Sequence, residues 1–204
     1  MLNSNQRMRL YRTMHSWHWI SAAICLAALL LFSITGVTLN HASAISARPE
    51  VTQGSARLPA ELIAELAGER ASTDAVPAAI QSWLEDQFDL GLAGASVEWS
   101  EEELYLSAPG PGRDAWVSVD RESGAANYET THRGWIAYFN DLHKGRNTGL
   151  AWTIFIDVVA AACVFFAFTG LVLLWIQARQ RTATWPLIGG GVAILVVLMV
   201  FLAH

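Results

Sequence analysis

The sequence contains three long runs that are almost free of charged residues. No Asp, Glu, Lys or Arg occurs in residues 13–47 or 182–204, and residues 147–178 contain only Asp157. Each run holds an apolar stretch close to the roughly 20 residues that an α-helix needs to cross a bilayer. In a chain of 204 residues that is 53% hydrophobic, this pattern excludes a purely soluble protein, a disordered chain and a nucleic-acid-binding protein.

The charges outside these runs change sign from one segment to the next. Residues 1–14 carry three arginines and no acid, residues 177–184 carry two arginines and no acid, and residues 42–149 carry 8 basic and 17 acidic residues. Basic residues in short loops stay on the cytoplasmic side of a membrane. The N-terminus and the 177–184 loop are therefore predicted to lie inside, and the acidic middle segment outside.

These patterns predict a membrane protein with three transmembrane α-helices and a small α+β domain inserted between helices 1 and 2. A net charge of −5 without a basic patch argues independently against a nucleic-acid partner. The predicted segments are a cytoplasmic N-terminus (1–14), transmembrane helix 1 (15–41), an outer domain (42–131), an outer connector with His132 and His143 (132–149), transmembrane helix 2 (150–176), a cytoplasmic loop (177–184) and transmembrane helix 3 (185–203).

A cleaved signal peptide is the alternative interpretation of the first run. The run follows a basic start and precedes Ala42-Ser43-Ala44, a sequence that suits a signal peptidase. Its apolar part, from Trp19 to Leu39, is however well beyond the roughly 7–15 residues of a signal-peptide core. We therefore expect this segment to be retained as a transmembrane helix, which N-terminal sequencing of the mature protein tests.

The outer region reads as a linker, two helices and a set of strands. Residues 42–58 are rich in Ala, Ser, Gly and Pro without a period, so we expect a linker there. Helical spacing of apolar residues predicts short helices over 59–66 and 77–88. Beyond these, apolar residues recur at every second position, which predicts antiparallel strands with tight turns and the helices on one face. The expected strands are centred on Val97 and Trp99, on Leu104 and Leu106, and on Trp116 to Val119, with a fourth that starts near Asn127.

Histidines carry most of the chemical information. Of the six in the chain, His15, His18, His41, His132 and His143 lie at or near the ends of predicted transmembrane helices. A histidine at the edge of an apolar helix is costly without a partner, and is a functional hypothesis by default. Membrane helix bundles hold haem through paired axial imidazoles, and imidazole also suits zinc, copper or iron. The pattern therefore predicts haem b, with a metal site lacking haem as an alternative.

Topology constrains which histidines can pair. His41 and His143 come from different segments that meet at the outer face, so they are the predicted axial ligands of one haem iron, with His132 as the reserve ligand. His15 and His18 lie three residues apart on one helix face, so they cannot approach one iron from opposite sides. An inner haem would therefore need a non-histidine ligand or a second copy of the chain, which predicts a homodimer.

Glycines and charged residues near these histidines extend the candidate site. Gly36 belongs to a Phe-x-x-Thr-Gly-x-x-Leu motif at 32–39 that recurs at 166–173, and a glycine allows close approach either of a flat ring or of a packed helix. Lys144 and Arg146 would pair with haem propionates or with lipid headgroups. Asp157, the single acid in a predicted membrane helix, would either orient a histidine ligand or fix helix packing through a hydrogen bond.

Several motifs around these residues form a recognisable set. They are His-Ser-Trp-His-Trp at 15–19, Thr-Gly-Val-Thr-Leu-Asn-His at 35–41, Val-Asp-Arg-Glu-Ser-Gly at 119–124, His-Arg-Gly-Trp at 132–135, Asn-Asp-Leu-His-Lys-Gly-Arg at 140–146 and Phe-Ile-Asp at 155–157. The 119–124 segment is similar to the strand–turn signature of the PepSY domain. Together, over nearly the whole chain, the motifs resemble those of the PepSY-associated transmembrane proteins.

The resemblance implies a bacterial inner-membrane protein with a periplasmic PepSY-like domain. Larger members of the family, with four transmembrane helices, are haem-containing ferric-siderophore reductases. We therefore expect an electron-transfer protein that takes electrons from a quinol or another protein and reduces a periplasmic acceptor such as ferric-siderophore iron, which would make it a ferric reductase. The alternative is a membrane-anchored PepSY module that binds or inhibits a periplasmic protein without redox activity.

Overall fold

The computed structural model describes residues 3–45, 48–66 and 75–202. The chain divides into two compact units, one made of residues 1–31 and 154–204 and the other of residues 32–153. Two long helices, α1 (Ser4–Asn40) and α5 (Leu150–Gln177), contribute to both units.

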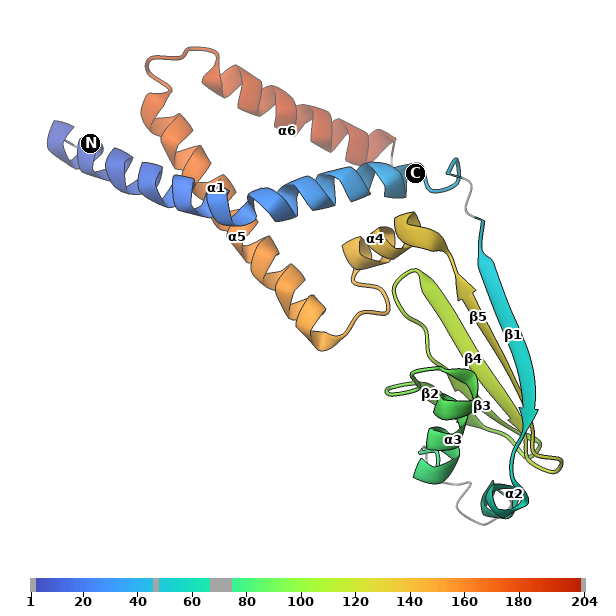
Figure 1. The fold of residues 1–204 in the computed structure, drawn as a ribbon. Helices are drawn as coiled ribbons and strands as arrows, with labels where there is room; N and C mark the ends of the chain where they lie inside the picture. The colour runs from blue at the N-terminus through green and yellow to red at the C-terminus, as the bar shows by residue number, and fades with distance from the viewer. Residues whose placement is uncertain (1–2, 46–47, 67–74, 203–204) are drawn as a thin grey trace. The chain divides into compact units, whose positions relative to one another are not determined.

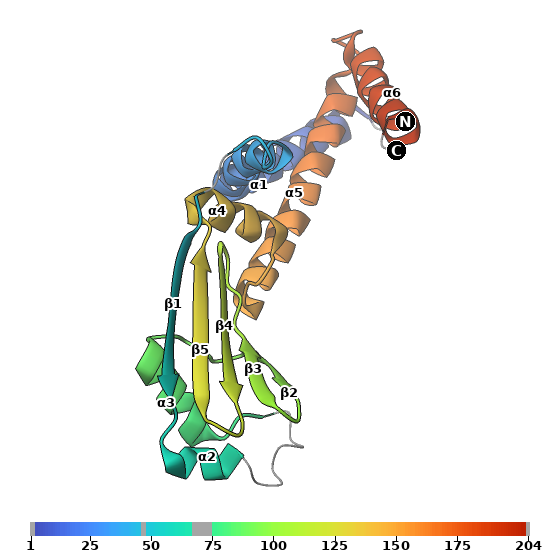
Figure 2. The same ribbon diagram turned by 90° about the vertical axis from the view of Figure 1, so that its right-hand side faces the viewer.

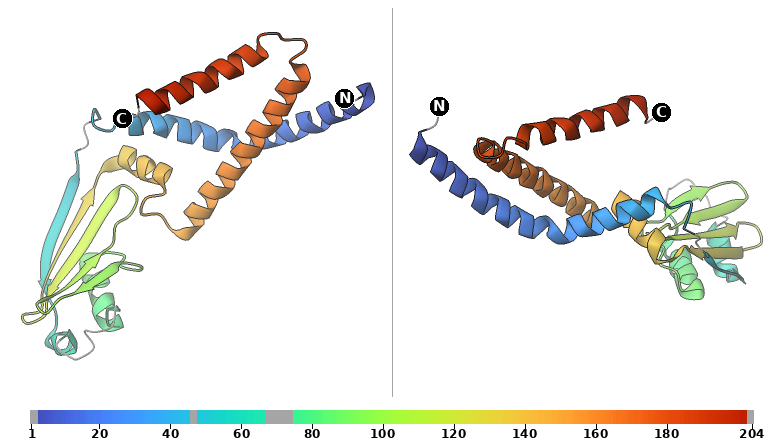
Figure 3. Two further views of the ribbon diagram at one scale, coloured as in Figure 1. Left: turned by 180° about the vertical axis from the view of Figure 1, so that it is seen from behind. Right: turned by 90° about the horizontal axis from the view of Figure 1, so that it is seen from above.

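Three helices are long and apolar enough to cross a membrane within the described ranges: α1, α5 and α6 (Thr184–Phe201). Figures 1 and 3 show α5 passing across α1, and α6 following α5 after a short loop. Many of their apolar side chains point outward; Val164 on α5 is 70% exposed and Phe201 on α6 is 73% exposed. Outward apolar surface of this extent is typical of helices in lipid. The predicted end of the last helix at residue 203 lies outside the described residues.

Polar and aromatic contacts join α1 to α5 within the first unit. The Arg7 guanidinium donates a hydrogen bond to the Ile176 carbonyl near the cytoplasmic ends predicted for both helices. The Trp17 and Phe165 rings meet edge to face with centroids 5.9 Å apart. Cys25 is buried in the same unit as a free thiol. Because lipid gives helices no hydrophobic drive to associate, such specific contacts decide which helix faces meet.

The second unit is built on an antiparallel sheet. Its strand order is β1-β5-β4-β3-β2, so every strand after β1 neighbours the strand that follows it in sequence, and β1 returns to pair with β5. Figure 2 shows the strands side by side. In the described part of the chain the five strands are β1 (Glu50–Arg57), β2 (Ser96–Trp99), β3 (Glu103–Ser107), β4 (Arg113–Asp120) and β5 (Ala125–His132).

Two helices, α2 (Ala60–Leu66) and α3 (Ala78–Phe88), cover one face of this sheet. Their apolar positions recur at helical spacing, so each helix buries one stripe against the strands. The alternate residues of β3 and β4 point into the same core, as the period-two pattern predicts. The largest fully buried members of this core are Leu66, Ile80, Leu84, Leu104, Leu106, Val117 and Val119.

Four of the strands and both short helices lie where the sequence predicted them, but the predicted linker over 42–58 is wrong in part. Residues 50–57 form β1, an edge strand whose side chains are mostly exposed. An exposed strand has no need of alternating apolar residues, so its sequence carries no period-two signal. Its register is supported instead by Tyr128 of β5, whose ring lies over Gly54 and fills the space of a missing side chain.

A helix that the sequence did not predict lies in the outer connector. This helix, α4 (Gly134–Lys144), follows β5 directly and ends at Gly145, which adopts a positive φ of 64°. Trp135, Ile136 and Phe139 are exposed on it. Exposed aromatic and aliphatic side chains on an amphipathic helix are typical of the membrane–water interface. α4 is also the helix that carries His143.

The turn between β4 and β5 depends on Asp120. The Ser123 hydroxyl and backbone N–H donate hydrogen bonds to its carboxylate at 2.6 and 2.7 Å, and these bonds lower the pKa of Asp120 below its ordinary value of 3.8. A carboxyl whose pKa is lowered by folding stabilises the fold above its unfolded pKa, and that contribution disappears as the pH falls through the folded pKa.

We therefore expect Ser123→Ala to raise the pKa of Asp120, because the replacement removes the hydroxyl donor. An NMR titration of the Asp120 carboxyl carbon in the full-length protein measures this shift. The resonance of Asp86, an exposed carboxylate elsewhere in the same unit, is the control, and at each pH it should be the same in the variant as in the wild type. An Asp120 pKa that is unchanged in the variant would contradict this account of the turn.

Candidate functional site

His143 docks on the repeated motif of α1. Its Nδ1 lies 2.6 Å from the Thr35 hydroxyl, and its ring meets the Phe32 ring edge to face with centroids 5.1 Å apart. A Cβ added to Gly36 would lie 3.7 Å from its Cε1 atom, so the ring lies beside the glycine. The imidazole is half-buried and contacts three residues of one short stretch of α1.

His18 docks in the same way on the second copy of the motif, in α5. Its Nδ1 lies 3.1 Å from the Thr169 hydroxyl and 3.2 Å from the Phe166 carbonyl. Its ring stacks on the Phe166 ring with centroids 4.4 Å apart and an interplanar angle of 13°. A Cβ added to Gly170 would lie 3.1 Å from the His18 Cε1 atom, which is tighter than ordinary contact. A side chain at position 170 would therefore require the His18 ring to shift by a few tenths of an ångström.

The oxygen partners of Nδ1 bear on the tautomer of each imidazole. A carbonyl oxygen can only accept, so the Phe166 contact requires that His18 Nδ1 carry the proton. The Thr169 hydroxyl donates to the Phe166 carbonyl at 2.9 Å, which leaves its lone pairs for the same N–H. The Thr35 hydroxyl lies 3.3 Å from the Phe32 carbonyl and 2.6 Å from His143 Nδ1, and it can donate to either. In neutral His18 the lone pair is therefore on Nε2, and the same holds for His143 when Thr35 donates to the carbonyl.

His41 has the same tautomer for a different reason. Its Nδ1 donates to the Val37 carbonyl of its own helix at 3.0 Å, and its side chain is exposed. Because that carbonyl accepts only, the lone pair of neutral His41 is again on Nε2. His41 and His143 both belong to the second unit, but among the described residues no hydrogen bond or ring contact joins them. Their pairing on one iron stays a prediction.

The other two predicted histidines lie in exposed positions. His15 contacts the Tyr11 ring of its own helix, with centroids 5.8 Å apart. His132 is the last residue of β5, where it pairs with Glu50 of β1 and Arg113 of β4 in the sheet register. The roles predicted for them, an inner-face ligand and a reserve ligand, stay predictions.

A buried carboxylate anchors the helix that carries His143. Asp141 is 3% exposed and accepts hydrogen bonds from the Gly112 backbone N–H and from the Arg133 guanidinium, both at 2.9 Å. Next to it, the buried Asn140 side chain accepts a hydrogen bond from the Thr38 hydroxyl at 2.6 Å. α4 is thereby tied both to the β3–β4 turn and to α1, and this fixes the position of His143.

The predicted charged members of the site occupy different environments. Arg146 lies 3.9 Å from the Asp141 carboxylate, so its charge is already partly paired. Lys144 is exposed at the end of α4, and Asp157 is exposed on α5. In the described part of the chain neither has a hydrogen bond or ion pair. That Lys144 pairs with a haem propionate, and that Asp157 orients a histidine ligand, stay predictions.

The donor set of the described residues can be compared with what a protein-held metal ion and a haem each require. No cluster of three or more His, Cys, Asp or Glu side chains suited to a metal ion occurs in the described ranges. A porphyrin supplies four of the iron ligands, so a haem needs only one or two imidazoles from the protein. An imidazole with Nδ1–H bonded and Nε2 carrying the lone pair is prepared for that role, since the bond on one nitrogen orients the other.

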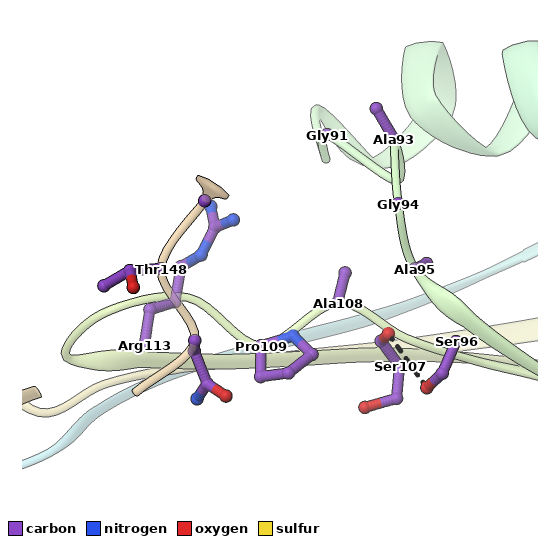
Figure 4. A pocket seen from close by; sticks show the side chains of 12 residues that line it. Gly91, Ala93, Gly94, Ala95, Ser96, Ser107, Ala108, Pro109, Arg113 and Thr148 are labelled. Carbon is purple, nitrogen blue, oxygen red and sulfur yellow. Dashed lines mark hydrogen bonds between the residues drawn. The ribbon is translucent and has the colours of Figure 1, made fainter. Parts of the chain in front are cut away.

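The second unit also has an open surface pocket of about 430 Å³. Figure 4 shows Arg113 on one side of it and the Ser96 hydroxyl bonded to the Ser107 carbonyl on the other. Arg113 is the single charged side chain among its lining residues, which include no histidine, so the pocket has none of the ligand chemistry described above. The lining residues are Gly91, Ala93, Gly94, Ala95, Ser96, Ser107, Ala108, Pro109, Arg113, Asn147, Thr148 and Gly149.

Sequence reasoning missed the partners of the histidines. The repeat of Phe, Thr and Gly was visible as a pattern, but it gave no indication of which side chain occupies each copy. Asp141 and Asn140 belong to the motif at 140–146, but their burial carried no signal, because polar residues before His143 are equally compatible with an exposed helix face. A regular spacing of polar and apolar residues over 134–144 was the available sign of α4.

The fold and the histidine contacts define a multi-helix membrane protein with a small antiparallel sheet domain. Residues 9–204 match the model of the family described as "Putative PepSY_TM-like". The chain therefore belongs to this PepSY-associated transmembrane family, as its motifs indicated. No curated protein and no solved structure matches the chain.

Proposed function

We propose that this chain is a haem b electron-transfer protein of the bacterial inner membrane. Its acidic sheet domain would lie in the periplasm, and it would pass electrons to a periplasmic acceptor such as the ferric iron of a siderophore complex. The observation that carries the proposal is shared by His18, His41 and His143: in each, Nδ1 lies within hydrogen-bond distance of an oxygen, and Nε2 carries the lone pair when Nδ1 donates to it. Three histidines arranged alike, in or beside helices long enough to cross a membrane, favour metal ligation over packing alone.

The outer site would be formed by His41 and His143. Haem supplies reversible one-electron chemistry when bound, and the chain supplies the axial imidazoles and their surroundings. Thr35 orients the His143 ring through Nδ1, and Phe32 and Gly36 hold it in place. Lys144, next to His143 and exposed, is available to pair with a propionate.

The remaining partners follow from the same proposal. The electron donor would be a membrane quinol or another protein, because the sequence contains no flavin or nicotinamide fingerprint. A second copy of the chain would complete any inner site at His15 and His18, so the protein would be a homodimer. Light scattering of the protein–detergent complex, combined with haem quantitation, tests that association.

The first experiment asks whether the purified protein absorbs visible light as a haem protein does. The full-length protein is purified from membranes in mild detergent, and its absorption spectrum is taken before and after reduction with dithionite. We expect a Soret band and a reduced α band, and we expect a ferric siderophore complex to reoxidise the reduced protein. A protein that is fully incorporated into membranes but colourless when purified would contradict the proposal and favour an anchored PepSY binding module.

Replacing Asp157 with asparagine is expected to raise the midpoint potential of the outer haem while leaving it bound. The replacement keeps the shape of the side chain and removes a negative charge that would increase the basicity of a histidine ligand. A spectroelectrochemical titration measures the potential. Asp89→Asn, an exposed site in the sheet domain, is the matched control. An unchanged potential combined with lower thermal stability would instead assign Asp157 a packing role.

A further inference from the structure

The two histidine clusters are made by an exchange between two parts of the chain. The first part, residues 18–39, contains a histidine followed by the Phe-x-x-Thr-Gly-x-x-Leu motif, and the second, residues 143–173, contains the same elements in the same order. His18 of the first part docks on the motif of the second. His143 of the second part docks on the motif of the first. Each part therefore both gives and receives a histidine.

The two docking arrangements share three contacts. In both, Nδ1 of the imidazole bonds to the threonine hydroxyl, Cε1 is the histidine atom closest to the space of the missing glycine side chain, and the ring contacts the motif phenylalanine. They differ in the phenylalanine geometry, which is stacked at His18 and edge to face at His143. The spacing from histidine to motif differs between the two parts, so what they share is the order of the elements and the contacts that these make.

The two clusters are separate sites. His18 is itself on α1, whereas His143 contacts Thr35 of the same helix. At a rise of 1.5 Å per residue, 17 residues correspond to about 25 Å of helix. One iron therefore cannot take both imidazoles.

We propose that the chain is an internal repeat with exchanged histidines, and that the His18 cluster is a second ligand site equivalent to the one at His143. Each site presents one imidazole Nε2 to its own metal centre. The identity of that centre as haem rests on the proposed function, whereas the equivalence of the two sites does not. If the outer site holds haem, the chain holds two.

Haem quantitation with histidine variants tests the number of sites. The full-length protein should contain two haems per chain, His18→Ala and His143→Ala should each contain one, and the double variant should contain none. One haem per wild-type chain, with no loss in His18→Ala, would overturn the proposal. Loss of all haem in either single variant would also overturn it, because it would show one shared site.

Threonine variants test whether the two sites are built alike. Thr35→Val and Thr169→Val remove the acceptor of Nδ1–H and should weaken haem binding at their own site by about 10–100-fold, as loss of a second-shell partner does. The effect at position 169 should be the smaller, since the Phe166 carbonyl also accepts from His18. Thr35→Ser and Thr169→Ser keep the hydroxyl and should bind as the wild type does. Weakening by only one of the two valine variants would contradict equivalence.

A measurement without haem separates failure of this inference from failure of the proposed function. In the haem-free protein labelled with ¹⁵N-histidine, NMR should show His18 and His143 as Nδ1–H tautomers. His143 should lose that preference in Thr35→Val and not in Thr169→Val, whereas His18 should keep it in both variants because its Nδ1–H also donates to the Phe166 carbonyl. If the protein is colourless but its histidines behave in this way, the haem proposal is wrong and the equivalence of the two histidine sites is kept. An Nε2–H tautomer at His18 overturns the inference whatever the colour.

Discussion

Replacing Asp141 with alanine is expected to lower the free energy of unfolding of the sheet-containing unit by about 3 kcal/mol, the size of effect seen when one member of a buried ion pair is removed. The carboxylate is 3% exposed and accepts from Gly112 and Arg133. Its removal leaves a buried backbone N–H without an acceptor and takes one partner from the Arg133 guanidinium. Denaturant unfolding of the full-length protein in detergent, followed by tryptophan fluorescence, measures the change.

Asp114→Ala is the matched control for that experiment. Asp114 also pairs with Arg133, at 3.3 Å, but its side chain is 47% exposed. An exposed ion pair of this kind contributes about 0–1 kcal/mol, so the control should unfold nearly as the wild type does. Equal losses in the two variants would show that burial of Asp141 is not what anchors α4.

His143→Ala is expected to remove most of the outer haem. The variant deletes one axial imidazole while Asp141 and Asn140 keep α4 in place, so the fold should be retained. The low-spin absorption spectrum and the haem content of the purified protein give the result. His41→Ala should have the same effect, whereas His132→Ala should retain the haem, because His132 is a reserve ligand only. A full low-spin spectrum in both the His41 and His143 variants would contradict the assignment of these ligands.

The sequence predicted those parts of the fold that local composition determines. Absence of charge over three runs indicated the membrane helices, because a charged side chain in lipid is costly. Period-two spacing indicated β2 to β5, because their alternate residues point into one core. β1 gave no such signal, since it is an exposed edge strand that β5 holds in place through pairing.

The candidate site was predicted by residue type but not by arrangement. Position at the helix ends singled out the histidines, yet the contacts that prepare them join residues 108 and 151 positions apart in sequence. Gly36 was expected to admit a flat cofactor or a packed helix, whereas the imidazole of His143 lies beside it. Only the folded chain brings α4 to α1 and His18 to α5, so the exchange of histidines between the two motifs could not be predicted.

Electron paramagnetic resonance of the oxidised, purified full-length protein shows whether imidazole Nε2 atoms of this chain ligate haem iron. We expect a low-spin ferric signal whose nitrogen couplings change when the protein is labelled with ¹⁵N-histidine, and which weakens in His143→Ala. No ferric haem signal, or a signal with couplings that the histidine label leaves unchanged, would contradict it.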